Sequence, residues 1–345
     1  MMKGNILKLC LFCLISVIFY ELRHFNVVTL TFEQHDGKSD RRADKHSTRN
    51  SEWIQAINRN MEKAEQRKHR FPDVIGIGVQ KCGTRAVHNF LQFHPYIRAL
   101  KYESHFFDQN KIEGLNYYRQ ILPTAADHEL VMEKTPAYFR TLSDNLPQIM
   151  HQLMPNLKII IILCNPTRRA LSGFVMAQTR NNKSENFDSY VKGVSLKNLS
   201  ENANKVQPQH IYRGIYHANM GRWINEFPDS HFIINGEDFL VNPGLVIEEL
   251  QDFLKIPKLL RREDFFRNET TGLFCVKKWW EKEMVSENWS EKSNVDSRLL
   301  HKGMTRSKVA LPQFSMSNNT RQVLNAFYRP HNEILYKMLG RNFGW

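Results

Sequence analysis

Residues 74–87 read VIGIGVQKCGTRAV, a short apolar run that gives way to a glycine-bearing turn. The run at 74–79 predicts a buried strand, residues 80–83 predict a turn, and residues 84–93, whose apolar side chains recur on one face, predict a helix. Such a turn presents backbone N–H groups and the positive end of the helix dipole to a phosphate group. The same pattern also occurs in ordinary strand-to-helix turns, so the stretch alone leaves both interpretations open.

The glycine spacing from Gly78 to Gly83 is that of a P-loop, but the lysine stands elsewhere. Nucleoside triphosphatases with this loop carry lysine directly after the second glycine. Here Lys81 lies two positions before Gly83, and Lys81 and Arg85 supply the positive charge around the turn. The sequence therefore argues against a nucleoside triphosphatase.

Strand and helix patterns alternate from Phe71 onward. Further strands are predicted at 97–100, 130–133, 158–163 and 231–235, and helices at 114–121, 146–153, 168–179, 216–226 and 243–253. Alternation of this kind predicts an α/β fold, a mostly parallel sheet flanked by helices. Sheets of this kind bind ligands at the carboxyl ends of their strands, which is where the turn at 80–83 lies.

The chain of 345 residues carries 48 Lys and Arg against 35 Asp and Glu, a formal net charge of +13. Its 41% hydrophobic residues indicate a globular protein and exclude wholesale disorder and fibrous repeats. Five cysteines are too few for a disulfide scaffold. The positive excess indicates a polyanionic partner: nucleic acid, an anionic membrane or an acidic glycan. No recognised nucleic-acid motif is present, which disfavours nucleic acid.

The N-terminal residues predict a membrane anchor. Residues 9–20 are almost entirely apolar and follow Lys3 and Lys8, a charge placement that puts the N-terminus in the cytosol. A cleaved signal peptide shares the pattern, but no small-residue cleavage site follows Tyr20, which favours an uncleaved anchor. We expect a cytoplasmic tail and signal-anchor at 1–24, a polar luminal stem at 25–70 that ends in a short amphipathic helix around Trp53 and Ile57, and a globular domain at 71–345.

Several stretches, taken together in this order, carry a family resemblance. They read KCGTRA at 81–86, ESHFFD at 103–108, MEKTPAYF at 132–139, GIY at 214–216, FYRPHN at 327–332 and FGW at 343–345. Here the chain resembles the Golgi sulfotransferases, most closely the heparan sulfate glucosamine 3-O-sulfotransferases. The resemblance implies a nucleotide-kinase-like, P-loop-like fold and transfer of a sulfuryl group from 3′-phosphoadenylyl sulfate (PAPS) to the 3-hydroxyl of glucosamine in heparan sulfate, without a metal. It also implies a single-pass type II protein of the Golgi membrane with a luminal catalytic domain.

The resemblance implies roles for individual residues. Glu103 is expected to be the general base for the acceptor hydroxyl, supported by His105 and Asp108. The 5′-phosphate of PAPS is expected at Lys81, Cys82, Gly83, Thr84 and Arg85, with Lys81 also stabilising charge on the leaving oxygen. The acceptor glycan is expected at Lys134, Thr135, Pro136 and Ala137. The alternatives are a solvated loop at 103–108 with a buried Phe106–Phe107 pair, and a structural Lys134 paired with Glu133.

The 3′-phosphate site is where the sequence departs from the family. There the strand ends Arg-Asp-Pro, and a serine follows eight positions after the arginine. Here the strand ends in Cys164, Asn165 and Pro166, while Ser172 retains the serine. A thiol cannot replace the bidentate fork of an arginine, so Arg168 or Arg169 would have to compensate. The loop that covers the nucleotide is expected at Lys302, Gly303, Met304, Thr305 and Arg306, with Met304 in place of the family's arginine.

These departures keep two classes of function open. One is an active glycosaminoglycan sulfotransferase, with a different acceptor position as its variant; the other is a catalytically weak relative that binds heparan sulfate. Lys101, Arg140 and Lys277 are candidate glycan contacts, or plain surface charge.

Cysteine pairing is also left open. Cys275 has no downstream cysteine with which to form the disulfide common in the family. Cys82 and Cys164 both follow predicted strands near the expected phosphates, so a disulfide between them stays one alternative. Five Asn-x-Ser/Thr sequons beyond the anchor agree with a secretory-pathway glycoprotein. They begin at Asn182, Asn198, Asn268, Asn288 and Asn318.

Overall fold

The computed structural model describes residues 51–59, 62–63, 66–109, 111–141, 145–192, 209–269, 272–277 and 315–345. These residues all belong to one unit, Ser47–Trp345. The predicted anchor, the stem before residue 51 and the predicted covering loop at 302–306 lie outside the described residues. Among the helices that the structure describes, none is both long and apolar enough to cross a membrane.

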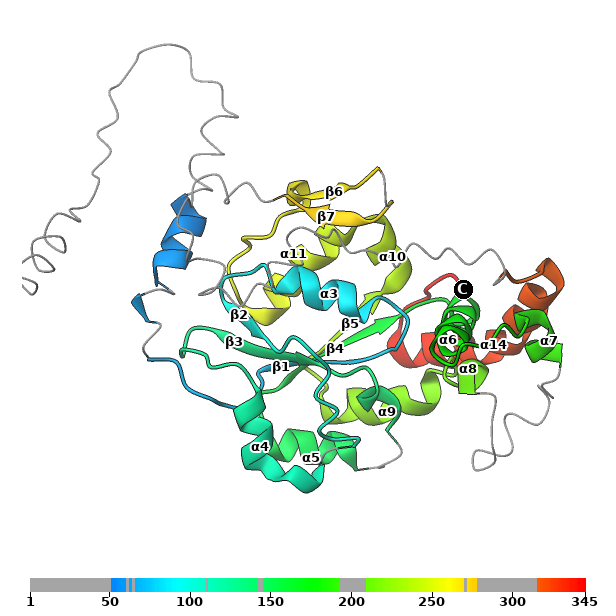
Figure 1. The fold of residues 1–345 in the computed structure, drawn as a ribbon, viewed down its shortest axis with the longest axis horizontal. Helices are drawn as coiled ribbons and strands as arrows, with labels where there is room; N and C mark the ends of the chain where they lie inside the picture. The colour runs from blue at the N-terminus through cyan, green and yellow to red at the C-terminus, as the bar shows by residue number, and fades with distance from the viewer. Residues whose placement is uncertain are drawn as a thin grey trace, which may run out of the picture. The chain divides into compact units, whose positions relative to one another are not determined.

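A five-stranded parallel sheet is the centre of the described unit (Figure 1). Its order is β2-β3-β1-β4-β5, and every neighbouring pair is parallel. The strands are β1 (Val74–Gly78), β2 (Ile97–Ala99), β3 (Leu130–Lys134), β4 (Lys158–Leu163) and β5 (His231–Asn235). Runs such as Lys158–Leu163 are almost wholly buried, as expected of a parallel sheet covered on both faces. The predicted α/β fold is confirmed.

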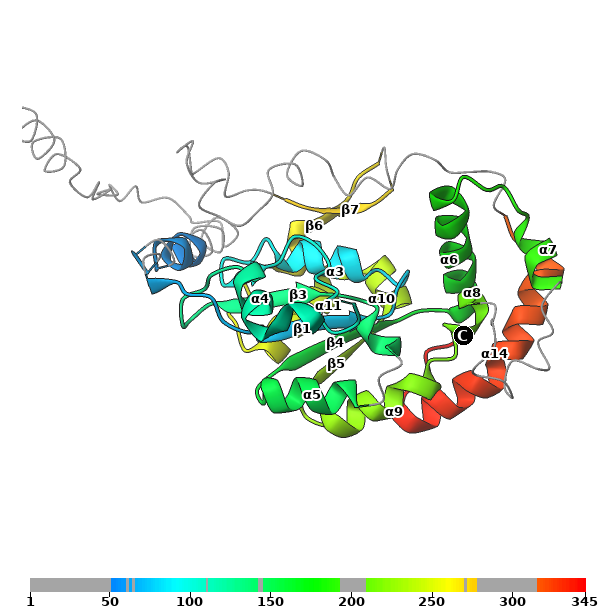
Figure 2. The same ribbon diagram turned by 60° about the horizontal axis from the view of Figure 1, so that its bottom comes forward.

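The helices predicted from the sequence are present. They are α3 (Thr84–Leu91), α4 (Gly114–Ile121), α5 (Leu146–Leu153), α6 (Pro166–Arg180), α9 (His217–Glu226) and α11 (Pro243–Leu254). Figures 1 and 2 show α3 and α11 on one side of the sheet and α5 and α9 on the other. Helix α6 begins two residues earlier than predicted, because the Asn165 side chain accepts hydrogen bonds from the backbone N–H groups of Thr167 and Arg168 and caps the helix.

Other elements were not predicted. They are α7 (Phe187–Lys192), α8 (Gln209–Tyr212), α10 (Gly236–Val241), α14 (Asn318–Leu339), the antiparallel pair β6 (Phe265–Arg267) and β7 (Phe274–Val276), and the short 3₁₀ helices η2 (Lys111–Glu113), η3 (Tyr138–Arg140) and η5 (Arg262–Asp264). Helix α14 contacts α6 and α9, and its Leu324 and Tyr328 belong to a second hydrophobic cluster with Phe174 of α6. The motif at 327–332 therefore packs against α6 through Tyr328.

The predicted amphipathic helix before the domain is confirmed at 51–59. Trp53 and Ile57 are buried, and the Trp53 indole N–H donates to the carbonyl oxygen of Leu259 at 3.1 Å. Ile54 is 40% exposed. This helix therefore packs against the described domain through its Trp53 face.

The sheet order decides where a site can form. Strand β1 lies between β3 and β4, so the segments that follow these three strands emerge side by side at the carboxyl ends of the strands, hereafter called the sheet edge. They are the turn at 80–83, the segment 135–137 and the segment 164–166. Because the chain leaves β1 toward one side and returns on the other, this edge is the topological switch point where such sheets bind ligands.

Candidate active site

The turn at 80–83 joins β1 to α3 and leaves the start of the helix open. Gly83 is the N-cap residue of α3, and no side chain caps the helix there. Its φ of 106° lies in the left-handed region that favours glycine. Arg85 in the first turn of α3 is exposed. The start of α3 thus offers backbone N–H groups and positive charge to an anion.

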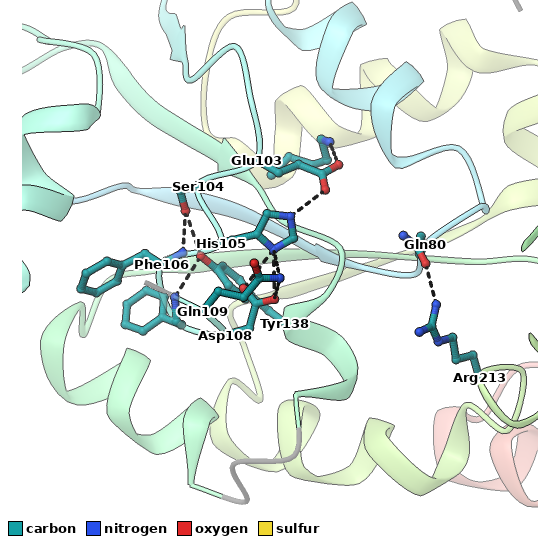
Figure 3. A network of polar contacts seen from close by, with 11 residues as sticks. Gln80, Glu103, Ser104, His105, Phe106, Asp108, Gln109, Tyr138 and Arg213 are labelled. Atoms are coloured by element: carbon teal, nitrogen blue, oxygen red, sulfur yellow. Dashed lines mark hydrogen bonds and ion pairs between the residues drawn. The ribbon is translucent and has the colours of Figure 1, made fainter. Parts of the chain in front are cut away.

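Four charged side chains form a continuous row beside this turn, hereafter the charged row: Lys134, Glu103, His105 and Asp108. The Lys134 ammonium group pairs with one carboxylate oxygen of Glu103, and the other oxygen lies 3.4 Å from Nε2 of His105. Nδ1 of His105 lies 3.0 Å from Oδ2 of Asp108. Figure 3 shows the imidazole ring between the two carboxylates. The three residues predicted at 103–108 therefore meet, and Lys134 joins them from the end of β3.

The row is partly open to solvent at its centre and buried at its ends. The side chains of Glu103 and His105 are about a third exposed, whereas those of Lys134 and Asp108 are 7% and 12% exposed. Burial lowers the pKa of Lys134, and the ion pair with Glu103 opposes that shift. The sequence alternative that paired Lys134 with Glu133 is wrong, because the ion pair of Lys134 is with Glu103.

Hydrogen bonds and aromatic packing hold the segment that carries Glu103 in place. The hydroxyl groups of Ser104 and Tyr138 lie 2.9 Å apart, and the backbone N–H of Phe106 donates to the Ser104 hydroxyl at 3.2 Å. The Phe106 ring stacks on Tyr118 with centroids 4.4 Å apart. The buried Phe106–Phe107 pair that the loop alternative expects is therefore present, while the partly exposed side chains of Glu103 and His105 above it belong to the charged row.

Glu133 is a further carboxylate beneath the charged row. The sequence motifs assigned it no function. It is fully buried on β3, on the strand face opposite to Lys134. Burial raises its pKa to about 7, and the surrounding hydroxyls of Ser104, Tyr138 and Tyr118 partly oppose that shift. The sequence signal that could have identified it is a glutamate directly after the apolar run 130–132 of the strand.

A disulfide joins the turn to the end of β4. The sulfur atoms of Cys82 and Cys164 are bonded, and their Cα atoms lie 5.3 Å apart. The Tyr216 hydroxyl donates to the carbonyl oxygen of Cys164 at 2.7 Å. Cys164 is fully buried. Its sulfur is thus already bonded, and the pairing left open by the sequence is present; Cys275 is free.

The two arginines that could replace the missing one both have partners. The Arg168 guanidinium pairs with Glu237 at 2.7 Å. Arg169 is buried, and its guanidinium donates to the carbonyl oxygen of His210. Ser172 lies one turn after Arg168 on α6 and is partly exposed. The candidate 3′-phosphate residues near β4 therefore present a hydroxyl group but no unpaired guanidinium.

The remaining predicted site residues divide between placed and undescribed. Thr84, Thr135 and Pro136 are buried, and Ala137 is partly exposed. The backbone N–H of Thr135 donates to the carbonyl oxygen of Gly76 at 3.1 Å, which ties the segment to β1. Lys302 to Arg306 lie outside the described residues. Among the residues that are described, no group of three or more His, Cys, Asp or Glu side chains could hold a metal ion.

Comparisons with known proteins agree with this geometry. A family model described as sulfotransferase domain matches residues 71–339. Heparan sulfate glucosamine 3-O-sulfotransferase 6 of Mus musculus is 32% identical over 281 residues, which cover 81% of this chain and 75% of that protein. Heparan sulfate glucosamine 3-O-sulfotransferase 5 of Mus musculus is 27% identical over 282 residues, 80% of this chain and 74% of that protein.

A solved structure shares the fold. The crystal structure of a sulfotransferase from Alicyclobacillus acidocaldarius superposes with a TM-score of 0.55 at 20% identity, over 79% of this chain and 97% of that one. At this level of identity the likeness concerns the arrangement of the sheet and its helices.

Proposed function

Because the chain belongs to the sulfotransferase family, we propose that it transfers a sulfuryl group from PAPS to the 3-hydroxyl of glucosamine residues in heparan sulfate. The family implies PAPS as the donor. The names of the relatives described above support heparan sulfate as the acceptor. The charged row carries the proposal, because it sets a carboxylate, an imidazole and an ammonium group at the sheet edge next to an open helix N-terminus.

Glu103 is the proposed general base. Its carboxylate is exposed enough to meet an acceptor hydroxyl and would take the proton of that hydroxyl as the new oxygen–sulfur bond forms. The bond from sulfur to the phosphate oxygen of PAPS would break in the same transfer, with adenosine 3′,5′-bisphosphate as the leaving group. Asp108 accepts a hydrogen bond from Nδ1 of His105, which fixes the ring so that Nε2 faces Glu103. His105 and Asp108 therefore orient the base, and Lys134 holds its other oxygen.

The donor side fits a phosphosulfate at its 5′ end. PAPS supplies the sulfuryl group, and the uncapped start of α3 together with Lys81 and Arg85 suits the adjacent 5′-phosphate. Lys81 follows directly on Gln80 in the turn and is the proposed charge partner of the leaving oxygen. Lys134 adds a third cation to this end of the site, where its positive charge and that of Arg85 repel each other.

A catalytically weak relative that binds heparan sulfate is the second candidate. One observation favours it: at the end of β4 the disulfide occupies the Cys164 sulfur, while Arg168 and Arg169 are engaged elsewhere. A 3′-phosphate would then lack the arginine that the family places there, and donor affinity would be low.

The disulfide supports a location in the secretory pathway, because disulfides persist in oxidising compartments. The sequons at Asn182 and Asn318 lie on exposed residues, which glycosylation requires. Together with the predicted anchor, these features support a single-pass type II protein of the Golgi membrane with a luminal catalytic domain.

The test uses the full-length protein with radiolabelled PAPS and heparan sulfate, followed by disaccharide mapping of the product. New sulfate on the 3-hydroxyl of glucosamine supports the proposal. New sulfate at another position keeps the sulfotransferase chemistry and refutes the acceptor position. Binding of heparan sulfate without incorporation of label supports the second candidate.

A further inference from the structure

Three arginines gather beside the 80–83 turn, and none of them has a carboxylate partner. Arg140 ends η3, Arg169 lies in α6, and Arg213 follows α8 directly. Among the described ion pairs, Arg67 and Arg98 share Glu129, and Arg168 pairs with Glu237, but none involves the three arginines of this cluster. Hereafter these three are called the arginine cluster. A carboxylate therefore balances the charge of Arg67, Arg98 and Arg168, whereas no described ion pair balances the charge of the arginine cluster.

The members of the cluster act on one another electrostatically. Burial, the largest cause, and the positive charges of Arg140 and Arg169 together lower the pKa of Arg213 to about 10. Burial also lowers the pKa of Arg140; Asp108 opposes that shift and Arg169 adds to it. Like charges held together away from water destabilise each other, so a bound anion would relieve the repulsion.

The contacts of Arg213 place the cluster at the turn. Its guanidinium donates to the side-chain oxygen of Gln80 at 3.1 Å and to that of Gln209 at 2.9 Å. Figure 3 shows the Gln80–Arg213 contact apart from the charged row. Both acceptors are neutral amides, so the charge of Arg213 is not compensated. Its buried Nε has no hydrogen-bond partner in the described structure.

Arg140 reaches the same edge from the opposite side of β1. Phe139, the residue before it, packs so closely on Gly78 that a Cβ at Gly78 would lie 2.5 Å from the Phe139 Cβ. This contact fixes η3 at the end of β1, directly before the turn. Arg140 is partly exposed, and the structure gives its guanidinium no hydrogen bond or ion pair. It is therefore available to a ligand at this edge.

We propose that Arg140 and Arg213, supported by Gln80 and by the buried charge of Arg169, form a subsite for a tetrahedral oxoanion. A guanidinium fork matches two oxygens of a sulfate or phosphate group, and two such forks with uncompensated charge favour a group of this class. The subsite rests on the proposed function, because the anion belongs either to the acceptor glycan, as a sulfate ester, or to the donor, as its 3′-phosphate.

Both sources fit the surroundings. Tyr216, three residues after Arg213, contacts Cys164, so this segment runs past the position where the family's phosphate-binding arginine is missing. Arg140 lies near enough to Asp108 of the charged row for their charges to interact. A donor phosphate would approach from the Cys164 side and a glycan sulfate from the charged row.

The test measures binding, so it does not depend on turnover. The full-length protein, Arg140→Gln, Arg213→Gln and the control Arg180→Gln are titrated at fixed ionic strength with adenosine 3′,5′-bisphosphate, adenosine 5′-phosphate and a heparin oligosaccharide. Arg180 is an exposed arginine at the end of α6, so its loss removes the same charge away from the cluster. Arg140→Gln removes no hydrogen bond of the described structure, and thermal unfolding checks that both cluster variants fold.

We expect both cluster variants to weaken binding of one probe by about tenfold or more, the usual loss for a charged hydrogen bond. Loss for the bisphosphate with no change for adenosine 5′-phosphate assigns the subsite to the 3′-phosphate; loss for the oligosaccharide alone assigns it to the glycan. Unchanged affinities, an equal loss in Arg180→Gln, or a wild-type protein that binds no probe overturns the subsite. If binding is lost as expected but the wild type incorporates no sulfate, the subsite stands and the proposed function fails.

Discussion

On one side of the candidate site, ion pairs and hydrogen bonds alone hold Lys134, Glu103, His105 and Asp108 in a row; on the other, a covalent bond joins Cys82 to Cys164. The charged row consists of groups that can take up or release protons and is open to solvent at its centre. The disulfide fixes two backbone segments but donates no hydrogen bond.

The two sides can therefore bind a ligand only in different ways. The charged row can itself do acid–base chemistry on an acceptor. In the proposed function, the disulfide side would bind phosphate through the start of α3 and through side chains away from the end of β4, because the cysteine there is buried and bonded. Three substitutions test this contrast between the two sides.

Of these three substitutions, the one that breaks the row at its buried end should have the largest effect. Lys134→Met removes the ammonium group that pairs with Glu103 and one cation near the reacting groups. Loss of one such charge-stabilising group should lower kcat by about 10²–10³. Steady-state sulfation of heparan sulfate measures it, with the exposed Lys337→Met as the matched control. A variant with kcat within twofold of the wild type would mean that Lys134 is structural only.

Removing the disulfide should change stability by a few kcal/mol. Cys82→Ser frees two segments that are 82 residues apart in sequence. The free energy of unfolding should fall by about 2–5 kcal/mol, the usual contribution of a native disulfide. Urea unfolding without reductant measures it, and Cys275→Ser, which removes a free thiol, should leave the midpoint unchanged. Equal midpoints for both variants would show that the covalent bond does not stabilise this side.

The pH dependence of the free energy of unfolding should report on Glu133, the buried carboxylate beneath the charged row. Burial raises the pKa of Glu133 from 4.5 to about 7 in the folded protein. The neutral carboxyl group therefore favours folding below about pH 4.5, and this stability is lost as the pH rises through 7. A shift of this size corresponds to about 3 kcal/mol.

Glu133→Gln keeps the shape and removes the titration. It should match the wild type at pH 4 and exceed it in free energy of unfolding at pH 8, by up to that amount. Glu113→Gln on the exposed η2 helix is the control. If the free energy of unfolding changed with pH in the same way in the wild type and in Glu133→Gln, the raised pKa of Glu133 would be contradicted.

The sequence predicts the parts that depend on local pattern. The apolar runs of β1 and β4 identify buried strands, and the i, i+3 spacing of His105 and Asp108 brings them together within one turn of chain. Helix α14 was missed because Pro330 and many polar residues interrupt its pattern, although Leu324, Tyr328 and Leu335 recur on its buried face.

The contacts that the sequence left open or did not predict depend on the order of the strands. Cys82 and Cys164 meet because β1 and β4 are neighbours, and Arg213 reaches Gln80 across 133 residues of sequence. Strand order follows from packing of the whole domain, which no local pattern contains. The sequence analysis named Glu133 only as a partner for Lys134. The two do not pair, because strand alternation on β3 places their side chains on opposite faces.

The central claim is that Glu103 is the base of a sulfuryl transfer, and Glu103→Gln tests it most directly. The full-length wild type and variant are compared for transfer from radiolabelled PAPS to heparan sulfate at saturating substrates, with affinity for adenosine 3′,5′-bisphosphate measured in parallel. The account predicts turnover lower by roughly 10²–10⁴, the usual contribution of a general base, with nucleotide affinity unchanged. Near-normal turnover by Glu103→Gln, with the fold intact, would contradict it.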